Sequence, residues 1–129
     1  MRLLLDTHVL IWLSKGSLDR IHPVIASGLA RGRHDIALSV VSLWEIAIKT
    51  RLGKLDSGAP PANLAAFFEA IGFTILPITH HHVVADVLPE PATRDPFDRL
   101  LLGQCRIEER SLVTLDHALR DHPLAARFA

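Results

Sequence analysis

The stretch Leu3-Leu4-Leu5-Asp6-Thr7-His8 decides how the rest of the chain is arranged. Three consecutive leucines indicate a short strand that is buried on both faces, as in a parallel sheet. Asp6 ends this apolar run, and residues 9–13 resume it with the spacing of a short helix. A carboxylate therefore lies where a buried strand passes into a helix, at the sheet edge where ligands bind. Taken alone, Asp6 is better explained as the helix N-cap.

The composition indicates one globular domain over residues 1–129, because 49% hydrophobic residues are enough for one core. Fourteen basic residues balance fourteen acidic ones, so the overall charge does not support a generic basic surface for nucleic acid. The single cysteine, Cys105, excludes an internal disulfide and a cysteine-based zinc site, and it fits a reducing cytoplasm. No apolar run reaches the length of a membrane span, and the first residues lack the features of a signal peptide, so we expect a cytoplasmic protein without membrane contact.

Strand-like and helix-like patterns alternate along the whole chain. Further strands are expected at 35–38, 73–76 and 111–115. Helices are expected within 17–32 and at 40–52, 61–71, 79–88 and 97–109, with a short one after Asp116. Pro23 is tolerated within 17–32 if the helix starts near His22, because proline then falls in the first turn. This alternation predicts an α/β fold with a mainly parallel sheet. Within the tail at 123–129, residues 125–128 could form an edge strand or be disordered, which leaves four or five strands.

Several carboxylates follow the predicted strands or open the predicted helices. Glu45 lies on the helix after the second strand, Asp95 and Asp98 open a later helix, and Asp116 follows the last strand. Each has a simpler explanation on its own. Glu45 can pair with Lys49 on a solvated helix face, and the aspartates can cap helices or favour their dipoles.

In a parallel sheet, however, these positions meet at one edge. Asp6 and Asp116 end strands there, the helix of Asp98 begins there, and Glu45 can reach back from about two turns into its helix. Several carboxylates in one cleft repel each other unless a cation lies among them. Oxygen ligands with open coordination positions suit Mg²⁺ or Mn²⁺, and such an ion can support phosphodiester hydrolysis.

Four motifs surround these acids: Leu4-Leu5-Asp6-Thr7-His8, Ser42-Leu43-Trp44-Glu45-Ile46-Ala47, Arg94-Asp95-Pro96-Phe97-Asp98-Arg99-Leu100-Leu101 and Leu112-Val113-Thr114-Leu115-Asp116. Together they resemble the PIN domain and, more narrowly, the VapC toxins of VapBC toxin–antitoxin systems. The resemblance implies a three-layer α/β/α sandwich. It also implies a metal-dependent RNA endonuclease with an acidic cluster that binds Mg²⁺ or Mn²⁺.

By the same resemblance, the acids of the cluster fall on Asp6, Glu45, Asp98 and Asp116, and three supporting residues fall on Asp95, Thr7 and Thr114. The resemblance implies RNA as substrate, a homodimer, and a hetero-oligomer with a VapB-type antitoxin that covers an apolar groove and blocks the site. We expect this groove beside the cleft, formed by the first helix with Trp12 and Leu13 and by the helix within 17–32.

Other conspicuous residues are given structural roles or left open. Arg94 and Arg99 flank the acid motif and can form helix-start salt bridges or contact RNA phosphates. His80-His81-His82 cannot converge on one ion, because consecutive helical residues point about 100° apart, so we expect a surface helix start. Cys105, Trp12 and Trp44 are expected in the core, and His8 is expected to pack or to face the rim of the groove.

Two other classes of function fit this scaffold less well. A receiver-like phosphoacceptor needs an acidic pair after the first strand and a late lysine, but only Asp6 follows that strand and the lysines come early. A non-catalytic binding module would be favoured by the loss of cluster acids, and all four acids are present.

Overall fold

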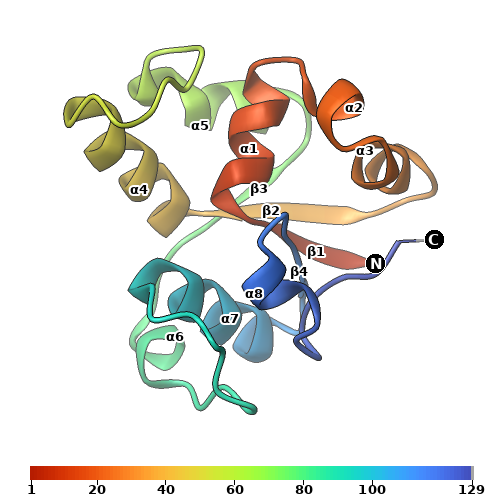
Figure 1. Cartoon of the computed structure of the whole chain (residues 1–129), viewed down its shortest axis with the longest axis vertical. Helices are drawn as coiled ribbons and strands as arrows, with labels where there is room; N and C mark the ends of the chain where they lie inside the picture. The colour runs from red at the N-terminus through yellow and green to blue at the C-terminus, as the bar shows by residue number, and fades with distance from the viewer. Residues whose placement is uncertain (129) are drawn as a thin grey trace.

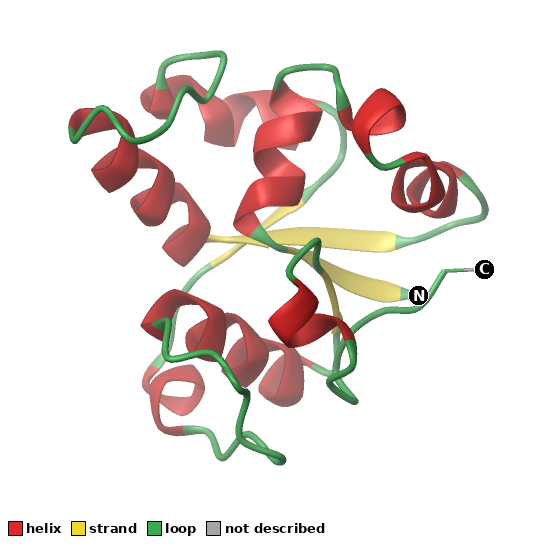
Figure 2. Ribbon diagram, in the orientation of Figure 1, coloured by secondary structure: helices red, strands yellow, loops and turns green. Residues whose placement is uncertain are grey.

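A four-stranded parallel sheet lies at the centre of the computed structural model, which describes residues 1–128. The strand order is β3-β2-β1-β4, and every neighbouring pair is parallel. Leu4 in the central strand lies opposite Ala37 on one side and Leu112 on the other. The prediction of an α/β fold with a parallel sheet is thus confirmed. The strands are β1 (Arg2–Leu5), β2 (Asp35–Ser39), β3 (Thr74–Leu76) and β4 (Ser111–Val113), drawn in yellow in Figure 2.

Helices cover both faces of the sheet and make three layers (Figure 1). One layer contains α1 (Thr7–Ser14), α2 (Leu18–Ile21), α3 (Pro23–Ala30) and α5 (Pro61–Ala70), and the other contains α6 (His80–Val84), α7 (Pro96–Glu108) and α8 (His117–Arg120). The remaining helix, α4 (Val40–Arg51), leaves the carboxyl end of β2 and packs against α1, α5 and α7. Within residues 1–128, no helix combines the length and the apolarity needed to cross a membrane.

The three leucines of β1 explain why the sheet is covered on both sides. Leu3 and Leu5 belong to the core under α1 and α5, whereas Leu4 belongs to the core under α7. All three side chains are fully buried, and each such burial stabilises the fold by about 1.5–3 kcal/mol. Cys105 lies in the second core, as predicted, and burial raises the pKa of its thiol to about 12.

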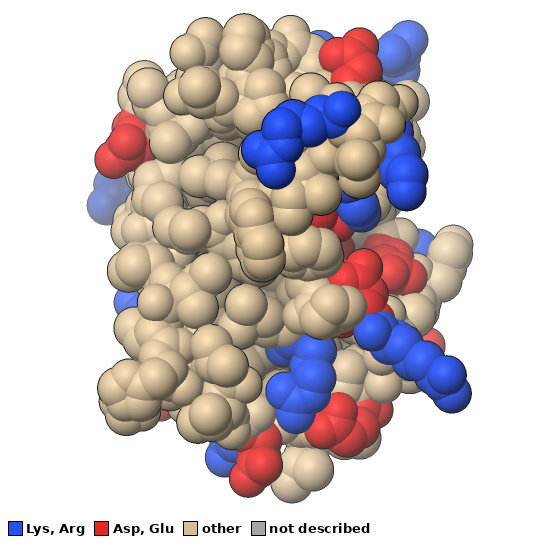
Figure 3. All heavy atoms as spheres, turned by 90° about the vertical axis from the view of Figure 1, so that its left-hand side faces the viewer, with Lys and Arg blue, Asp and Glu red and all other residues tan. Residues whose placement is uncertain are grey.

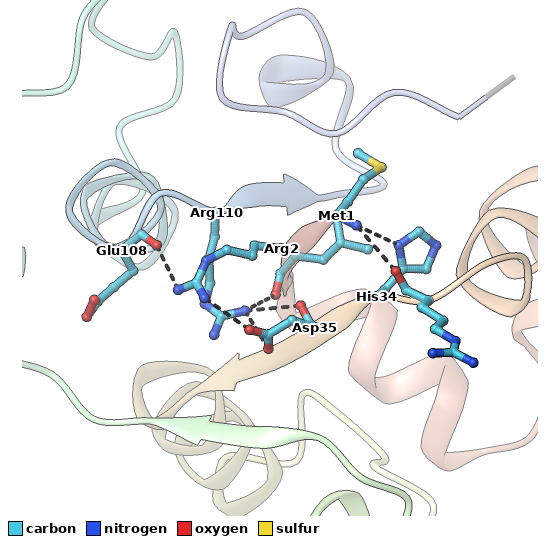
Figure 4. Close-up of polar contacts among 8 residues, drawn as sticks. Met1, Arg2, His34, Asp35, Glu108 and Arg110 are labelled. Carbon is cyan, nitrogen blue, oxygen red and sulfur yellow. Dashed lines mark hydrogen bonds and ion pairs between the residues drawn. The ribbon is translucent and has the colours of Figure 1, made fainter.

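A charged network at the amino ends of the strands fixes their register (Figure 4). The buried Arg110 donates through Nη1 to the carbonyl of Leu3 and to the carbonyl and Oδ1 of Asp35, each at 3.1 Å. Arg2 donates to the other Asp35 oxygen and to the carbonyl of Glu108. These contacts join β1, β2 and the segment between α7 and β4 at the edge opposite Asp6.

Two helical segments differ in part from the sequence-based prediction. Within 17–32 a helix does start at His22, which is the N-cap of α3, and Pro23 takes a position in its first turn as expected. The preceding residues form the separate short helix α2, because His22 has a φ of −136° and a ψ of 74°, outside the α conformation that a following proline disfavours. The helix predicted over 79–88 ends at Val84, and Ala85 is extended. The carbonyls of Ala85 and Asp86 instead accept hydrogen bonds from Arg99 and Arg106 of α7, so tertiary contacts replace the missing helical ones.

The end of the chain forms neither an edge strand nor a disordered segment over residues 123–128. Ala125 makes a single parallel bridge to Leu112, in which Leu112 N–H donates to the carbonyl of Leu124 and Ala126 N–H donates to the carbonyl of Leu112. Phe128 packs against Gly28 of α3 so closely that a side chain at position 28 would meet its ring. Residue 129, at the end of the predicted tail, lies outside the described residues. The described sheet therefore has four strands.

Candidate active site

Asp6 lies at the carboxyl end of β1 with both carboxylate oxygens hydrogen-bonded. The backbone N–H of Thr7 donates to Oδ1 at 2.6 Å, and the hydroxyl of Thr114 donates to Oδ2 at 2.7 Å. Only 4% of Asp6 is exposed, and this burial raises its pKa above the ordinary value, although the two hydrogen bonds oppose the rise. Asp6 therefore caps α1 and also lies at the sheet edge, so the two interpretations do not exclude each other.

Glu45 reaches the same edge from the second turn of α4. Its Oε1 accepts a hydrogen bond from the Thr7 hydroxyl at 2.6 Å, and its Oε2 lies 2.5 Å from Lys49 Nζ. The expected pairing with Lys49 is present, but Glu45 is buried instead of solvated. The hydrogen bond to Glu45 is the main reason why the pKa of Lys49 is raised. Ser42 Oγ lies 3.0 Å from the Thr7 hydroxyl and completes this network.

The first turn of α7 carries two of the acids. Asp95 is the N-cap, because its Oδ1 accepts from the backbone N–H of Phe97 at 2.8 Å, and Pro96 takes the first helical position. Asp98 is half-buried and accepts from the Thr93 hydroxyl at 3.3 Å. Its pKa is raised to about 7, first by burial and then by repulsion from Asp6, Asp95, Asp116 and Glu45.

Asp116 follows β4 and caps α8, with Oδ1 accepting from the backbone N–H of Ala118 at 2.8 Å. It is exposed, unlike Asp6 and Glu45. Thr114 links the two strand-end acids, since its hydroxyl donates to Asp6 and accepts from the backbone N–H of Asp116 at 3.1 Å. The structure thus brings Asp6, Glu45, Asp95, Asp98 and Asp116 within electrostatic reach of one another.

The view onto the carboxyl ends of the strands shows this arrangement (Figure 3). Acidic side chains gather in and beside a hollow at mid-height, with basic side chains above and below. Within residues 1–128, no three His, Cys, Asp or Glu side chains already converge as metal ligands. The donor set nevertheless fits Mg²⁺ or Mn²⁺, because it consists of carboxylate oxygens that lie close enough to repel one another, and this repulsion adds to burial in raising the pKa of Asp98.

The arginines near the acid motif have different surroundings. Arg99 forms an ion pair with Glu90 at 2.9 Å, which matches the salt-bridge alternative. Arg94 is exposed on the segment before α7, and no ion pair to it is found within residues 1–128. His8 is exposed, and it lines a small hollow beside Glu45, at the rim of the site as expected.

The expectation that Trp44 lies in the core was wrong, and so was the expectation that His82 lies on the surface. Trp44 is 57% exposed and packs edge-on against Phe97 with 5.6 Å between ring centroids. Trp12, by contrast, is partly buried against the core, as expected. His82 is buried, and its Nδ1 accepts a hydrogen bond from the backbone N–H of Thr79, which completes the cap of α6. His80 and His81 are exposed, as a surface helix start requires.

The sequence does not predict Ser42 and Thr93 as members of the site, where they contact Thr7 and Asp98. It does predict the pairing of Glu45 with Lys49 from their spacing of four residues, and in the structure Glu45 forms this pair while it is buried at the sheet edge.

The chain is thus a parallel α/β protein with a carboxylate cluster at the carboxyl ends of its strands. Its sequence matches the PIN domain family over residues 3–123, and the chain belongs to this family, whose members are generally nucleases. Its fold is similar to that of a chain in the crystal structure of VapBC2 from Rickettsia felis bound to a DNA fragment from their promoter. The TM-score is 0.61 at 13% sequence identity, over 97% of this chain and 96% of that one. No curated protein matches the sequence.

Proposed function

We propose that this PIN domain is a metal-dependent RNA endonuclease that acts in the cytoplasm as the toxin of a VapBC-like toxin–antitoxin pair. One observation carries the proposal: Asp6 and Glu45 are buried and Asp98 is half-buried at the carboxyl ends of the strands, where they lie close enough to Asp116 for the four acids to interact. Carboxylates kept buried and close to one another are typical of functional sites. Family membership supports nuclease activity, and the VapBC2 chain shares the fold.

Asp6, Glu45, Asp98 and Asp116 would hold Mg²⁺ or Mn²⁺. When bound, the ion neutralises charge on the scissile phosphate and lowers the pKa of an attacking water. Thr114 orients Asp6 through its 2.7 Å hydrogen bond, and Thr7 orients Glu45 at 2.6 Å. Asp95 fixes the start of α7, and Asp98 lies within the first turn of that helix.

Growth of cells that express the chain without a partner tests this proposal. The wild type should arrest growth. Asp98→Asn should not, because it removes a charge from the metal site while keeping an oxygen for the hydrogen bond from Thr93. Asp19→Asn is the matched control, since it removes an exposed carboxylate from the first turn of α2. Arrest by folded, equally abundant Asp98→Asn protein at wild-type strength would contradict a catalytic role.

We further propose that an antitoxin segment occupies an apolar groove of about 510 Å³ beside the acids. The apolar part of its lining includes Ile21, Val24, Ile25 and Phe128, and Arg120 and Arg127 also line it. Val24 is 55% exposed and Ile21 is 39% exposed, and exposed apolar side chains that lie together in one groove mark a surface that a partner covers. Thr114 lies in this groove and bonds to Asp6, so an arginine of the partner could reach the cluster. Residues of α2, α3 and the C-terminal segment line this groove. The combination expected from the sequence, α1 with the helices of 17–32, instead lines a second apolar hollow of about 380 Å³ that contains Leu13, Leu18 and Ala26 and none of the acids of the cluster.

We also propose a homodimer in which exposed apolar side chains of α6 and the following loop are covered by a second copy. Val83 is 58% exposed, Val84 is 74% exposed and Leu88 is 76% exposed. Light scattering of the purified protein measures this directly. A monomer for the wild type at micromolar concentration would contradict it, and Val84→Glu should dissociate a dimer.

A further inference from the structure

A small basic hollow adjoins the acid cluster between α1 and α4. Its volume is about 270 Å³, and its polar lining consists of Thr7, His8, Glu45, Lys49 and Lys54. Glu45 and Thr7 belong to both the hollow and the acid cluster, so the two sites share a wall. Two of the five polar side chains are lysines and a third is a histidine, although the whole chain has a formal net charge of zero.

The end of α4 explains why two lysines face one hollow. Lys49 lies one turn after Glu45 on the same side of the helix. The helix ends at Arg51, and Gly53 takes a φ of +71°, which glycine adopts without strain. The backbone N–H of Lys54 then donates to the carbonyl of Lys49 at 2.9 Å. This hydrogen bond holds the backbone of Lys54 next to that of Lys49, and both lysines line the hollow.

The charges in the hollow leave capacity for an anion. Both oxygens of Glu45 are already hydrogen-bonded, one to Thr7 and one to Lys49. Lys49 uses one of its three ammonium donors in this bond. Lys54 is exposed, and no ion pair to it is found in the described part of the chain, residues 1–128. His8 is exposed at the rim and adds a further donor.

We propose that this hollow binds a backbone phosphate of the RNA strand, next to the phosphate that is cleaved, with Lys49 and Lys54 as its ligands. The inference rests on the proposed function, because it assigns a subsite to the same substrate. A phosphate fits the hollow with room for bridging water. The carboxylates of the acid cluster alone would repel the RNA strand, which is a polyanion. A basic subsite beside them offsets this repulsion. The hollow thus positions the strand across the acids.

Binding of a fluorescently labelled single-stranded RNA 12-mer, followed by anisotropy at 50–200 mM KCl, tests this assignment. The measurements use Asp98→Asn protein to prevent cleavage, alone and combined with Lys54→Gln, Lys54→Arg or Lys15→Gln. Lys15 is the matched control, because it is the remaining lysine of the chain and lies over the Trp12 ring, outside the hollow. Lys54→Gln should raise the Kd about fivefold at 100 mM KCl and reduce the slope of log K against log salt by about 0.7. Lys54→Arg and Lys15→Gln should leave both nearly unchanged.

The outcomes separate this subsite from the proposed function. If the wild type cleaves RNA but Lys54→Gln binds it like Lys15→Gln, the subsite is wrong and the nuclease proposal stands. If the wild type cleaves no RNA but Lys54 still supports binding, the subsite stands and the nuclease proposal fails. Absence of RNA binding at 50 mM KCl overturns the subsite. The subsite is also overturned if Lys54→Gln weakens binding of the antitoxin but leaves RNA binding unchanged, because the hollow would then contact a protein.

Discussion

Replacing Asp98 by asparagine should stabilise the metal-free protein at pH 8 but not at pH 4. Asp98 is half-buried among other acids, which raises its pKa in the folded chain from 3.8 to about 7. The folded state therefore binds a proton more tightly than the unfolded state does. The stability that this proton provides is complete below about pH 4 and is lost as the pH rises to about 7. The asparagine side chain does not titrate, so the Asp98→Asn protein does not lose this stability as the pH rises.

The two pKa values set the size of the effect. At about 1.36 kcal/mol per pH unit, the difference between 3.8 and about 7 corresponds to a ceiling of about 4 kcal/mol above pH 7. Asp98 is only half-buried, so solvent screens part of the repulsion. We therefore expect Asp98→Asn to be more stable than the wild type by about 1–2 kcal/mol at pH 8 in EDTA.

Urea unfolding of both proteins in EDTA at pH 4, 6 and 8 measures this difference. The gain should grow between pH 4 and 8, and Asp19→Asn should show no comparable trend. A gain of the same size at every pH would mean that the carboxyl does not titrate as described. A loss of stability at pH 8 would refute the repulsion on which the proposed metal site depends.

Three further predictions concern other parts of the molecule. Mg²⁺ or Mn²⁺ should raise the melting temperature, because each tenfold increase of the ion concentration above its Kd adds about 1.4 kcal/mol to the free energy of unfolding. Asp6→Asn should abolish this rise in melting temperature. An equal rise in that variant would indicate nonspecific ion effects. Thr114→Val should destabilise the fold by about 1.5–3 kcal/mol, measured by urea unfolding, because the buried Asp6 loses a charged hydrogen bond; an unchanged midpoint would refute that account. Val24→Glu should change the free energy of unfolding by less than about 0.5 kcal/mol and leave RNA cleavage intact, because Val24 is exposed. It should prevent pull-down of the co-expressed antitoxin, because Val24 lines the groove. Unimpaired capture would exclude the groove as the antitoxin-binding site.

The parts of the fold that could be predicted follow from local rules. Three adjacent leucines require burial on both faces, and Leu4 indeed packs in a different core from Leu3 and Leu5. The start of α4 at the Ser39 cap and its end before Gly53 also follow from local capping chemistry.

The errors arose where tertiary contacts decide. Trp44 lies among apolar residues, but α4 projects from the sheet edge, so only the side of the helix that carries Ile46 is covered. His82 belongs to a polar run, but it caps α6 and is buried beside Gln104 and Glu108 of α7. Neither environment can be deduced from neighbours in the sequence.

The candidate site divides in the same way. The positions of Asp6 and Asp116 could be predicted, because strand ends and helix caps are visible in the sequence. The resemblance implies that Thr7 and Thr114 also belong to the site, but their pairing with particular acids could not be predicted. Thr114 is 108 residues from Asp6, and Thr7 is 38 residues from Glu45, so only the folded sheet brings these pairs together. The basic hollow was missed for the same reason.

Digestion of purified total RNA with mapping of the new 5′ and 3′ ends tests the central claim most directly. The account predicts cleavage at defined positions that requires Mg²⁺ or Mn²⁺, that is lost in Asp98→Asn and Asp6→Asn, and that persists in Asp19→Asn. Cleavage in EDTA, or cleavage by Asp98→Asn at the wild-type rate, would contradict the assignment of the acid cluster as the metal-dependent active site.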